Sequence, residues 1–166
     1  MSRTALASTM LRQPCPSTAD LRLRRLTQGD VPAIETHLLA LDMVSRNNRF
    51  HCALGDAAVA RYAQRFDNTA DLLFGAIDAG SGRIVALAEA RPAGAPRTVD
   101  VAVSVHAAHR RRGLGRTLVA CTVSAAFAQG ATAAHLRFAP GNLPAVRIAA
   151  GLGARFGAPG QAILVA

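Results

Sequence analysis

The stretch VAVSVHAAHRRRGLGRTLVA, Val101 to Ala120, decides the fold of this chain. Its first residues alternate as a β-strand does, and its last residues place apolar side chains at helical spacing. Between the two lie three consecutive arginines and the glycines Gly113 and Gly115. A helix N-terminus presents unpaired N–H groups and the positive end of the helix dipole, which together favour phosphate. We therefore predict that this strand-to-helix turn binds an anion, most simply a phosphate or pyrophosphate.

The composition indicates one globular domain and limits the chemistry available to it. Of 166 residues, 51% are hydrophobic and 17% are charged, which is enough apolar material for a core. All nineteen basic residues are arginine, and the net charge is +9. Without lysine, Schiff-base or lysine-nucleophile chemistry is excluded. The arginines are dispersed except within 110–112 and 22–25, and aromatic residues that could stack bases are few, so nucleic acid is not the expected partner.

The cysteines and histidines suggest neither a disulfide framework nor a metal site. Cys15, Cys52 and Cys121 are widely scattered, which predicts a reducing, cytoplasmic location. His106 and His109 lack a third ligand at a suitable spacing, so we expect no metal. No apolar run is long enough for a transmembrane helix, and no membrane partner is expected.

Two regions follow from the distribution of apolar residues. Residues 1–20 are expected to form a flexible tail, because their apolar runs are too short for a secretory signal; a transit peptide is the alternative. Residues 21–166 are expected to form the domain. Periodicity and turn residues predict strands at 21–27, 71–78, 83–92, 99–105, 133–139 and 161–166, a short strand near 154–157, and helices at 30–43, 56–66, 113–129 and 142–152.

The spacing Arg110-x-x-Gly113-x-Gly115 matches neither of the common phosphate-loop patterns, GxGxxG and GxxxxGK[ST]. Between an apolar strand and a long helix, it resembles the Arg/Gln-x-x-Gly-x-Gly/Ala motif of the GNAT superfamily of N-acetyltransferases. A basic, solvated helix start is the alternative interpretation. The resemblance implies that the loop binds the pyrophosphate of acetyl-coenzyme A (acetyl-CoA) through Arg110, Arg111, Arg112, Gly113, Leu114, Gly115 and Arg116.

A second segment, GNLPAVRIAAGLGARF, resembles a later motif of the same family through Asn142, Ala145, Leu152 and Gly153. The family's Asn contacts the pantetheine arm, which implies this role for Asn142 beside that of a helix N-cap. The order of elements is similar from residue 21 to the C-terminus. The resemblance therefore implies a GNAT fold of the α/β (α+β) class: a mixed central sheet of six to seven strands, splayed between the fourth and fifth, with about four flanking helices.

In the GNAT fold, pantetheine pairs with backbone groups of the strand before the loop, where the central strands part. By position, these groups belong to Val103, Ser104 and Val105. The same N–H groups would polarise the thioester carbonyl and stabilise the negative charge that develops on its oxygen.

Acetyl transfer to an ammonium group near pH 7 requires a base. Asp100 lies at the start of the strand before the loop, where many members of the family carry Glu. Strand alternation places Asp100 on one face with Ala102 and Ser104. We expect Asp100 to be the base, with Glu89 as the second candidate; for both, an ordinary ion pair with an arginine is the alternative.

The chain departs from the family pattern at the expected general acid. A Tyr commonly follows the motif's Asn by seven residues, and here that residue is Ala149. The only tyrosine is Tyr62, in an earlier predicted helix. Either water or another group protonates the thiolate, or turnover is slow.

Two functions remain open. The first is an acetyl-CoA-dependent N-acetyltransferase, monomeric or homodimeric, that acetylates a small amine or a protein lysine by direct attack. A weak finer similarity to protein-lysine acetyltransferase domains does not decide the acceptor. The alternative is a catalytically weak module that binds acyl-CoA as a sensor or structural ligand.

Overall fold

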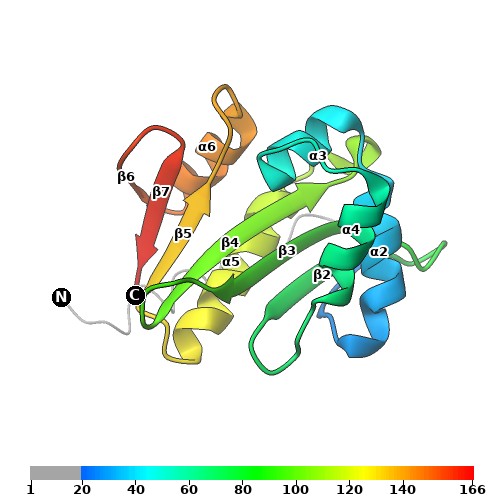
Figure 1. Ribbon diagram of the computed structural model, residues 1–166, viewed down its shortest axis with the longest axis horizontal. Helices are drawn as coiled ribbons and strands as arrows, with labels where there is room; N and C mark the ends of the chain where they lie inside the picture. Colours follow the sequence, from blue (N-terminus) through cyan, green and yellow to red (C-terminus); the bar gives the residue numbers. More distant parts are fainter. Residues whose placement is uncertain (1–19) are drawn as a thin grey trace.

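Seven strands form one sheet in the computed structural model, which describes residues 20–166. Their order is β1-β2-β3-β4-β5-β7-β6 (Figure 1). The strands are β1 (Leu21–Arg25), β2 (Leu72–Asp78), β3 (Ile84–Pro92), β4 (Thr98–Val105), β5 (Ala133–Arg137), β6 (Arg155–Phe156) and β7 (Gln161–Val165). The helices are α2 (Val31–Leu39), α3 (Met43–Phe50), α4 (Asp56–Gln64), α5 (Leu114–Ala128) and α6 (Leu143–Gly151), with 3₁₀ turns η1 (Gln28–Asp30) and η2 (Ala107–His109). The predicted flexible tail lies outside the described residues, apart from its last residue.

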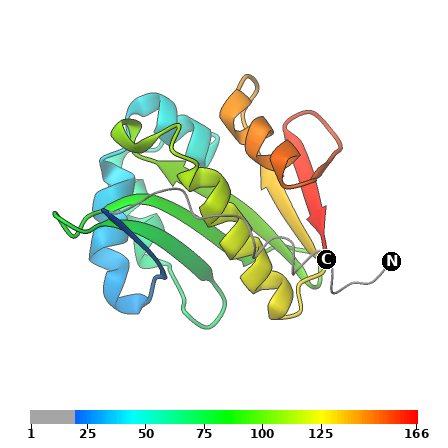
Figure 2. The same cartoon turned by 180° about the vertical axis from the view of Figure 1, so that it is seen from behind.

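Helices cover both faces of the sheet. Figure 2 shows α5 crossing one face with α6 beside it, and Figure 1 shows α2, α3 and α4 on the other. On the α5 face, fully buried residues such as Leu118 and Val123 pack on the sheet. On the opposite face, Leu38 of α2 and Val59 of α4 pack against Leu87 of β3. Strand β3 is therefore buried on both sides, which explains its long apolar run.

The sheet parts between β4 and β5. These strands are parallel and pair only over Thr98–Val101 and Ala133–Leu136. Strand β4 continues to Val105, still paired with β3 on its other edge. Figure 1 shows the two strands diverging into a V above this point. The mixed sheet and its splay between the fourth and fifth strands confirm the predicted fold.

The sequence analysis missed one helix, α3. Its residues, MVSRNNRF, carry no apolar stripe, and Ser and Asn compete with the helix backbone for hydrogen bonds. Asp42 begins the helix by accepting the Ser45 N–H at 2.8 Å, and His51, in the left-handed conformation at φ 59°, ends it. The side chain of Arg46 donates to the Leu39 carbonyl oxygen. Local capping and a hydrogen bond to the end of α2, rather than an apolar stripe, thus define α3.

A buried histidine ties α2 to the sheet. His37 is 2% exposed; its Nδ1 lies 3.0 Å from the Ile84 carbonyl oxygen and its Nε2 lies 2.8 Å from Ser104 Oγ. Because a carbonyl can only accept, Nδ1 carries the proton and the Ser104 hydroxyl donates to Nε2. Burial lowers the pKa of His37 to about 4, so the imidazole is neutral at pH 7.

We expect this histidine to make the fold sensitive to mild acid. Between pH 6.5 and pH 4 the unfolded histidine binds a proton that the folded one excludes. Stability is therefore full above this window and falls as the pH drops through it, by up to ~1.4 kcal/mol per pH unit. Urea denaturation at several pH values should show this slope, and His37→Gln should flatten it although the variant is less stable overall. Equal slopes in both proteins would contradict the assignment.

Candidate active site

The loop between β4 and α5 has the backbone groups for an anion. Arg111 (φ 60°) and Gly113 (φ 78°) both adopt the left-handed conformation, and Gly113 caps α5. The first hydrogen bond of the helix runs from the Thr117 N–H to the Gly113 carbonyl oxygen. No oxygen of residues 20–166 accepts a hydrogen bond from the N–H groups of residues 111–116. These donors, at the positive end of a 15-residue helix, form a site suited to phosphate.

Of the four arginine side chains of this region, two are held by other parts of the protein and two are exposed. Arg110 lies 2.8 Å from Asp42 at the start of α3, also donates to the Ser45 hydroxyl, and donates through Nε to the Val105 carbonyl oxygen at 3.2 Å. Arg116 donates to the carbonyl oxygen of Gly151 on α6 at 2.8 Å. By contrast, the side chains of Arg111 and Arg112 are exposed and make no ion pair with a described carboxylate. Their guanidinium groups are the ones available to a bound anion.

Two further loop residues face the interior. The side chain of Leu114 is buried, so only its N–H can serve a ligand. Gly115 is also buried, and a Cβ there would lie 3.0 Å from Ile148 Cδ1 and 3.5 Å from Val105 Cγ2. A glycine at this position lets α5 approach both β4 and α6 closely.

The open edge of β4 offers unpaired backbone groups. The His106 N–H donates to the Val85 carbonyl oxygen of β3, and antiparallel pairing alternates from there. Ser104 therefore directs its N–H and C=O to β3, opposite its register partner Leu87. Val103 and Val105 direct theirs away from β3, past the point where β5 has left the sheet. Of the three residues expected from the sequence, these two face the gap, where the Val105 carbonyl oxygen already accepts the Arg110 Nε–H.

A cleft lies in this gap, lined by residues of β4, β5, α3 and α6. Asn142 caps α6 by accepting the Ala145 N–H at 3.3 Å, and both residues line the cleft. Ala149, at the position of the family's tyrosine, is fully buried in the core instead. The residues lining the cleft are Asn48, Arg49, His51, Val101, Ala102, Val103, Leu136, Arg137, Phe138, Asn142, Ala145 and Ile148.

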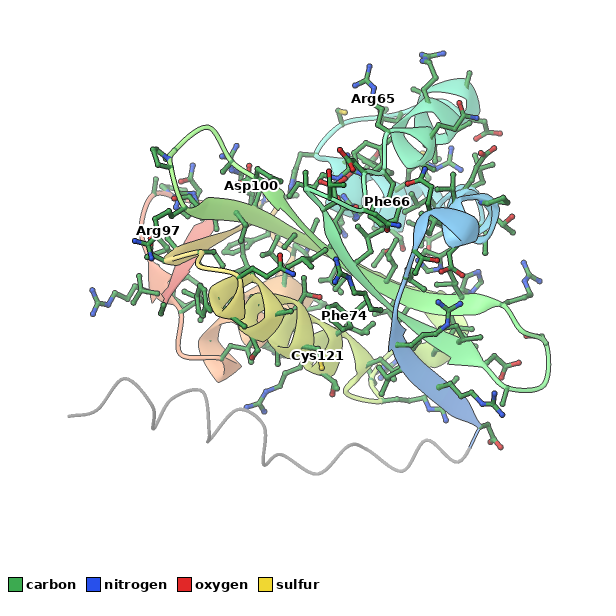
Figure 3. The ribbon with its side chains drawn as sticks, turned by 90° about the horizontal axis from the view of Figure 1, so that it is seen from below. Arg65, Phe66, Phe74, Arg97, Asp100 and Cys121 are labelled. Carbon is green, nitrogen blue, oxygen red and sulfur yellow. The ribbon has the colours of Figure 1, made fainter. Side chains whose placement is uncertain are left out.

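Asp100 lies on the face of β4 that points away from α5, as Figure 3 shows. Its side chain is 42% exposed, and Oδ1 lies 3.3 Å from Arg137 Nη2 at the end of β5. Asp100 Oδ1 is buried and makes no hydrogen bond, so its contact with Arg137 is an ion pair alone. The carboxylate is thus near the cleft and retains capacity to accept a proton or a hydrogen bond.

Glu89 lies on the same face as Asp100 but is buried within a charged cluster. Its Oε1 is 2.6 Å from Arg49 and 3.6 Å from Arg91, and it accepts a hydrogen bond from the Tyr62 hydroxyl. Burial raises the pKa of this carboxyl group, but Arg49 and Arg91 outweigh burial and leave the pKa below its usual value. Glu89 is therefore a carboxylate occupied by its partners, less available as a base than Asp100.

The sequence analysis missed two residues of the cleft, Arg49 and His51. Arg49 is 4% exposed in its side chain and packs over the ring of Phe50, 5.0 Å from its centroid. The pKa of His51 is lowered by burial and by the charges of Arg49 and Arg137, so its imidazole is neutral near pH 7. Both residues come from α3 and its cap, and no sequence signal marked them once that helix had been missed.

The comparisons with known proteins agree with this geometry. Residues 41–154, more than half of the chain, match the model of the Acetyltransferase (GNAT) family, and no curated protein matches. The GNAT domain of Streptomyces lividans PAT is similar at 20% identity over 88% of this chain and 90% of that chain, with a TM-score of 0.72. The protein yncA of Salmonella typhimurium, solved with its cofactor acetyl-CoA, is 16% identical over 88% and 94%, with a TM-score of 0.70. A GCN5-related N-acetyltransferase from Kribbella flavida is 23% identical over 89% and 97%, with a TM-score of 0.68.

Two further findings concern residues 20–166. None of their helices is long and apolar enough to cross a membrane. No three His, Cys, Asp or Glu side chains among them are grouped where they could hold a metal ion.

The family match, the splayed sheet and the loop at the head of α5 lead to one conclusion: the chain belongs to the GNAT acetyltransferase family.

Proposed function

We propose that this protein is an acetyl-CoA-dependent N-acetyltransferase that transfers an acetyl group to a primary amine by direct attack. The observation that carries the proposal is the continuity of three features. The anion-binding loop leads into the open edge of β4, and this edge leads to a cleft with Asp100 beside it. A small amine and a protein lysine are both acceptors of this class. We place the protein in the cytoplasm on its scattered cysteines, of which Cys52 is an exposed thiol.

The residues present fit acetyl-CoA. The N–H groups of residues 111–116 and the guanidinium groups of Arg111 and Arg112 would hold the pyrophosphate. The backbone groups of Val103 and the N–H of Val105 would pair with the pantetheine arm, and Asn142 lines the same cleft. When bound, acetyl-CoA supplies the acetyl group as an activated thioester.

The chemistry of this chain's own residues follows from that placement. Asp100 would take the proton of the acceptor ammonium, directly or through water, and so produce the neutral amine. The amine nitrogen then bonds to the acetyl carbon, the carbon–sulfur bond breaks, the nitrogen loses its second proton to water, and the thiolate gains a proton. The Val103 N–H would stabilise the negative charge on the carbonyl oxygen during this step.

The source of the proton for the thiolate separates this proposal from its alternative. The α6 residues that line the cleft include Ala145 and Ile148, which carry no hydroxyl group, and Ala149 is buried. We infer that water protonates the thiolate. This feature favours acyl-CoA sensing as the second candidate, which predicts binding without turnover on any amine.

Acetyl-CoA binding can be tested with two glycine variants at opposite ends of α5. A hundredfold excess of acetyl-CoA over Kd should stabilise the wild-type protein by roughly 2.7 kcal/mol, a rise of several degrees in Tm. Gly113→Glu should abolish this shift, because it adds a carboxylate where the pyrophosphate binds. Gly130→Glu is the matched control, since Gly130 also has a positive φ (96°) and open space around it. Gly115→Glu is less informative, because it would also disturb the packing of Ile148.

Equal shifts in Gly113→Glu and Gly130→Glu would refute the assignment of the loop. A wild-type protein that shows no shift with acetyl-CoA, acyl-CoA or CoA would refute both the enzyme and the sensor.

The base can be tested with Asp100→Asn. We expect kcat/KM at neutral pH to fall by ~10²–10⁴, the usual scale for a general base, with acetyl-CoA affinity unchanged. The loss should shrink as the pH approaches the pKa of the amine, because neutral amine then forms without help. Asp56→Asn is the control, since Asp56 is an exposed carboxylate, ion-paired with Arg46, on α4.

Glu89→Gln distinguishes the two carboxylates. It leaves Arg49 as an uncompensated buried charge and should cost ~3–5 kcal/mol of stability, with activity lost only in proportion to unfolded protein. A full rate in Asp100→Asn together with a large kcat loss in folded Glu89→Gln would transfer the role of base to Glu89.

A further inference from the structure

The carboxylate proposed as the base has a positive charge directly beside it. Arg137 Nη2 lies 3.3 Å from Asp100 Oδ1, and the two side chains are 57% and 42% exposed. Oδ1 makes no hydrogen bond in this contact. Exposed ion pairs of this kind contribute little stability, so a ligand can separate the two groups at low cost. An amine held at Asp100 would then have the Arg137 guanidinium group within reach of its nearest atoms.

A second guanidinium group, that of Arg49, lines the same cleft. Arg49 comes from α3, and Arg137 comes from β5. The Nη2 of Arg49 is occupied by Glu89 and Tyr62, but the Nε of Arg49 is buried without a hydrogen-bond partner. Such a donor is costly to bury unless a ligand supplies an acceptor.

The pKa of His51 also reflects these two guanidinium groups. The charges of Arg49 and Arg137 both act on His51, after burial, to lower its pKa. The charges of both guanidinium groups therefore act at this point of the cleft.

Resting on the proposed function, we propose that the acceptor is a small amine with a carboxylate close to its amino group, that is, a free amino acid. Its amino group binds at Asp100 and its carboxylate binds at Arg137. In an α-amino acid two bonds connect the nitrogen to the carboxylate carbon, which suits a base and a guanidinium group in contact with each other. Guanidinium groups bind carboxylates strongly because the hydrogen bonds are charge-assisted.

A lysine in a peptide fits the same groups less well. Its ammonium group ends a four-carbon chain with no anion nearby, so Arg137 and the Arg49 Nε would gain no acceptor. A basic peptide would also meet repulsion from both guanidinium groups and from a chain of net charge +9.

The test compares matched acceptors. The twenty proteinogenic L-amino acids, the amide of each, and a peptide with a single lysine are assayed with acetyl-CoA by release of the free thiol. We expect the best amino acid to exceed its own amide in kcat/KM by roughly 10- to 100-fold, the scale of a charged hydrogen bond. Calorimetry of the same amino acids and amides on the CoA-saturated protein gives a second readout that does not depend on turnover.

Arg137→Gln should reduce this ratio to about one, and because both acceptors use the same base, the ratio cancels any effect of the substitution on Asp100. Arg155→Gln is the matched control, since Arg155 is an exposed arginine on β6 outside the cleft, and it should keep the full ratio. An unchanged ratio in Arg137→Gln would overturn the role of that residue and with it the proposal. Arg49 is unsuitable for this comparison, because its replacement breaks a buried ion pair.

The remaining outcomes separate this proposal from the proposed function. Amides or the lysine peptide acetylated as fast as the amino acids would overturn it while leaving an N-acetyltransferase. If no amine is acetylated although acetyl-CoA raises Tm, the calorimetry decides: binding of amino acids but not of amides supports the proposal, and no binding overturns it. An absent shift in Tm with acetyl-CoA would overturn both.

Discussion

The parting of β4 from β5 after Val101 is the constraint on which the rest of the structure depends. In a continuous sheet a neighbouring strand would pair the N–H and C=O groups of Val103 and Val105, and no ligand could add to that edge. Because β4 and β5 are parallel, a crossover must join them, and α5 is that crossover. The turn into α5 therefore lies at the head of the open edge. One topological choice thus positions both the anion-binding loop and the cleft below it.

Buried charged groups hold the wall of the cleft that α3 forms. Arg49, Glu89 and Tyr62 come from α3, β3 and α4, and the three groups contact one another within the protein. A second arginine, Arg91, lies over the Tyr62 ring, 4.4 Å from its centroid. Buried ion pairs add little net stability, because desolvation offsets the attraction. Their value here is geometric, since α3 has no apolar stripe to fix its position and depends on Arg49 and Arg46 to do so.

The sequence predicted what local pattern controls and failed where distant residues decide. Strand alternation correctly placed Asp100 and Ser104 on one face, and glycine spacing correctly placed the turn before α5. Helix α3 was missed because it has no apolar stripe and because one of its arginines, Arg49, pairs with Glu89 far along the chain. Ala149 shows a second limit: counting seven residues from Asn142 finds the family's position, but only packing shows that this side of α6 is turned into the core. The partners of individual loop arginines were likewise beyond any pattern in the sequence.

The side chain of Arg110 connects the anion-binding loop to the start of α3. Asp42 accepts the Ser45 N–H as the cap of α3 and also pairs with Arg110, 68 residues away. Hydrogen bonds from Ser45, and next from Arg110, lower the pKa of this carboxyl group to about 2 despite its slight burial. The Asp42 carboxylate is therefore charged at neutral and mildly acidic pH. Because α3 also carries Arg49, one helix contacts both the anion-binding loop, through Asp42, and the cleft, through Arg49.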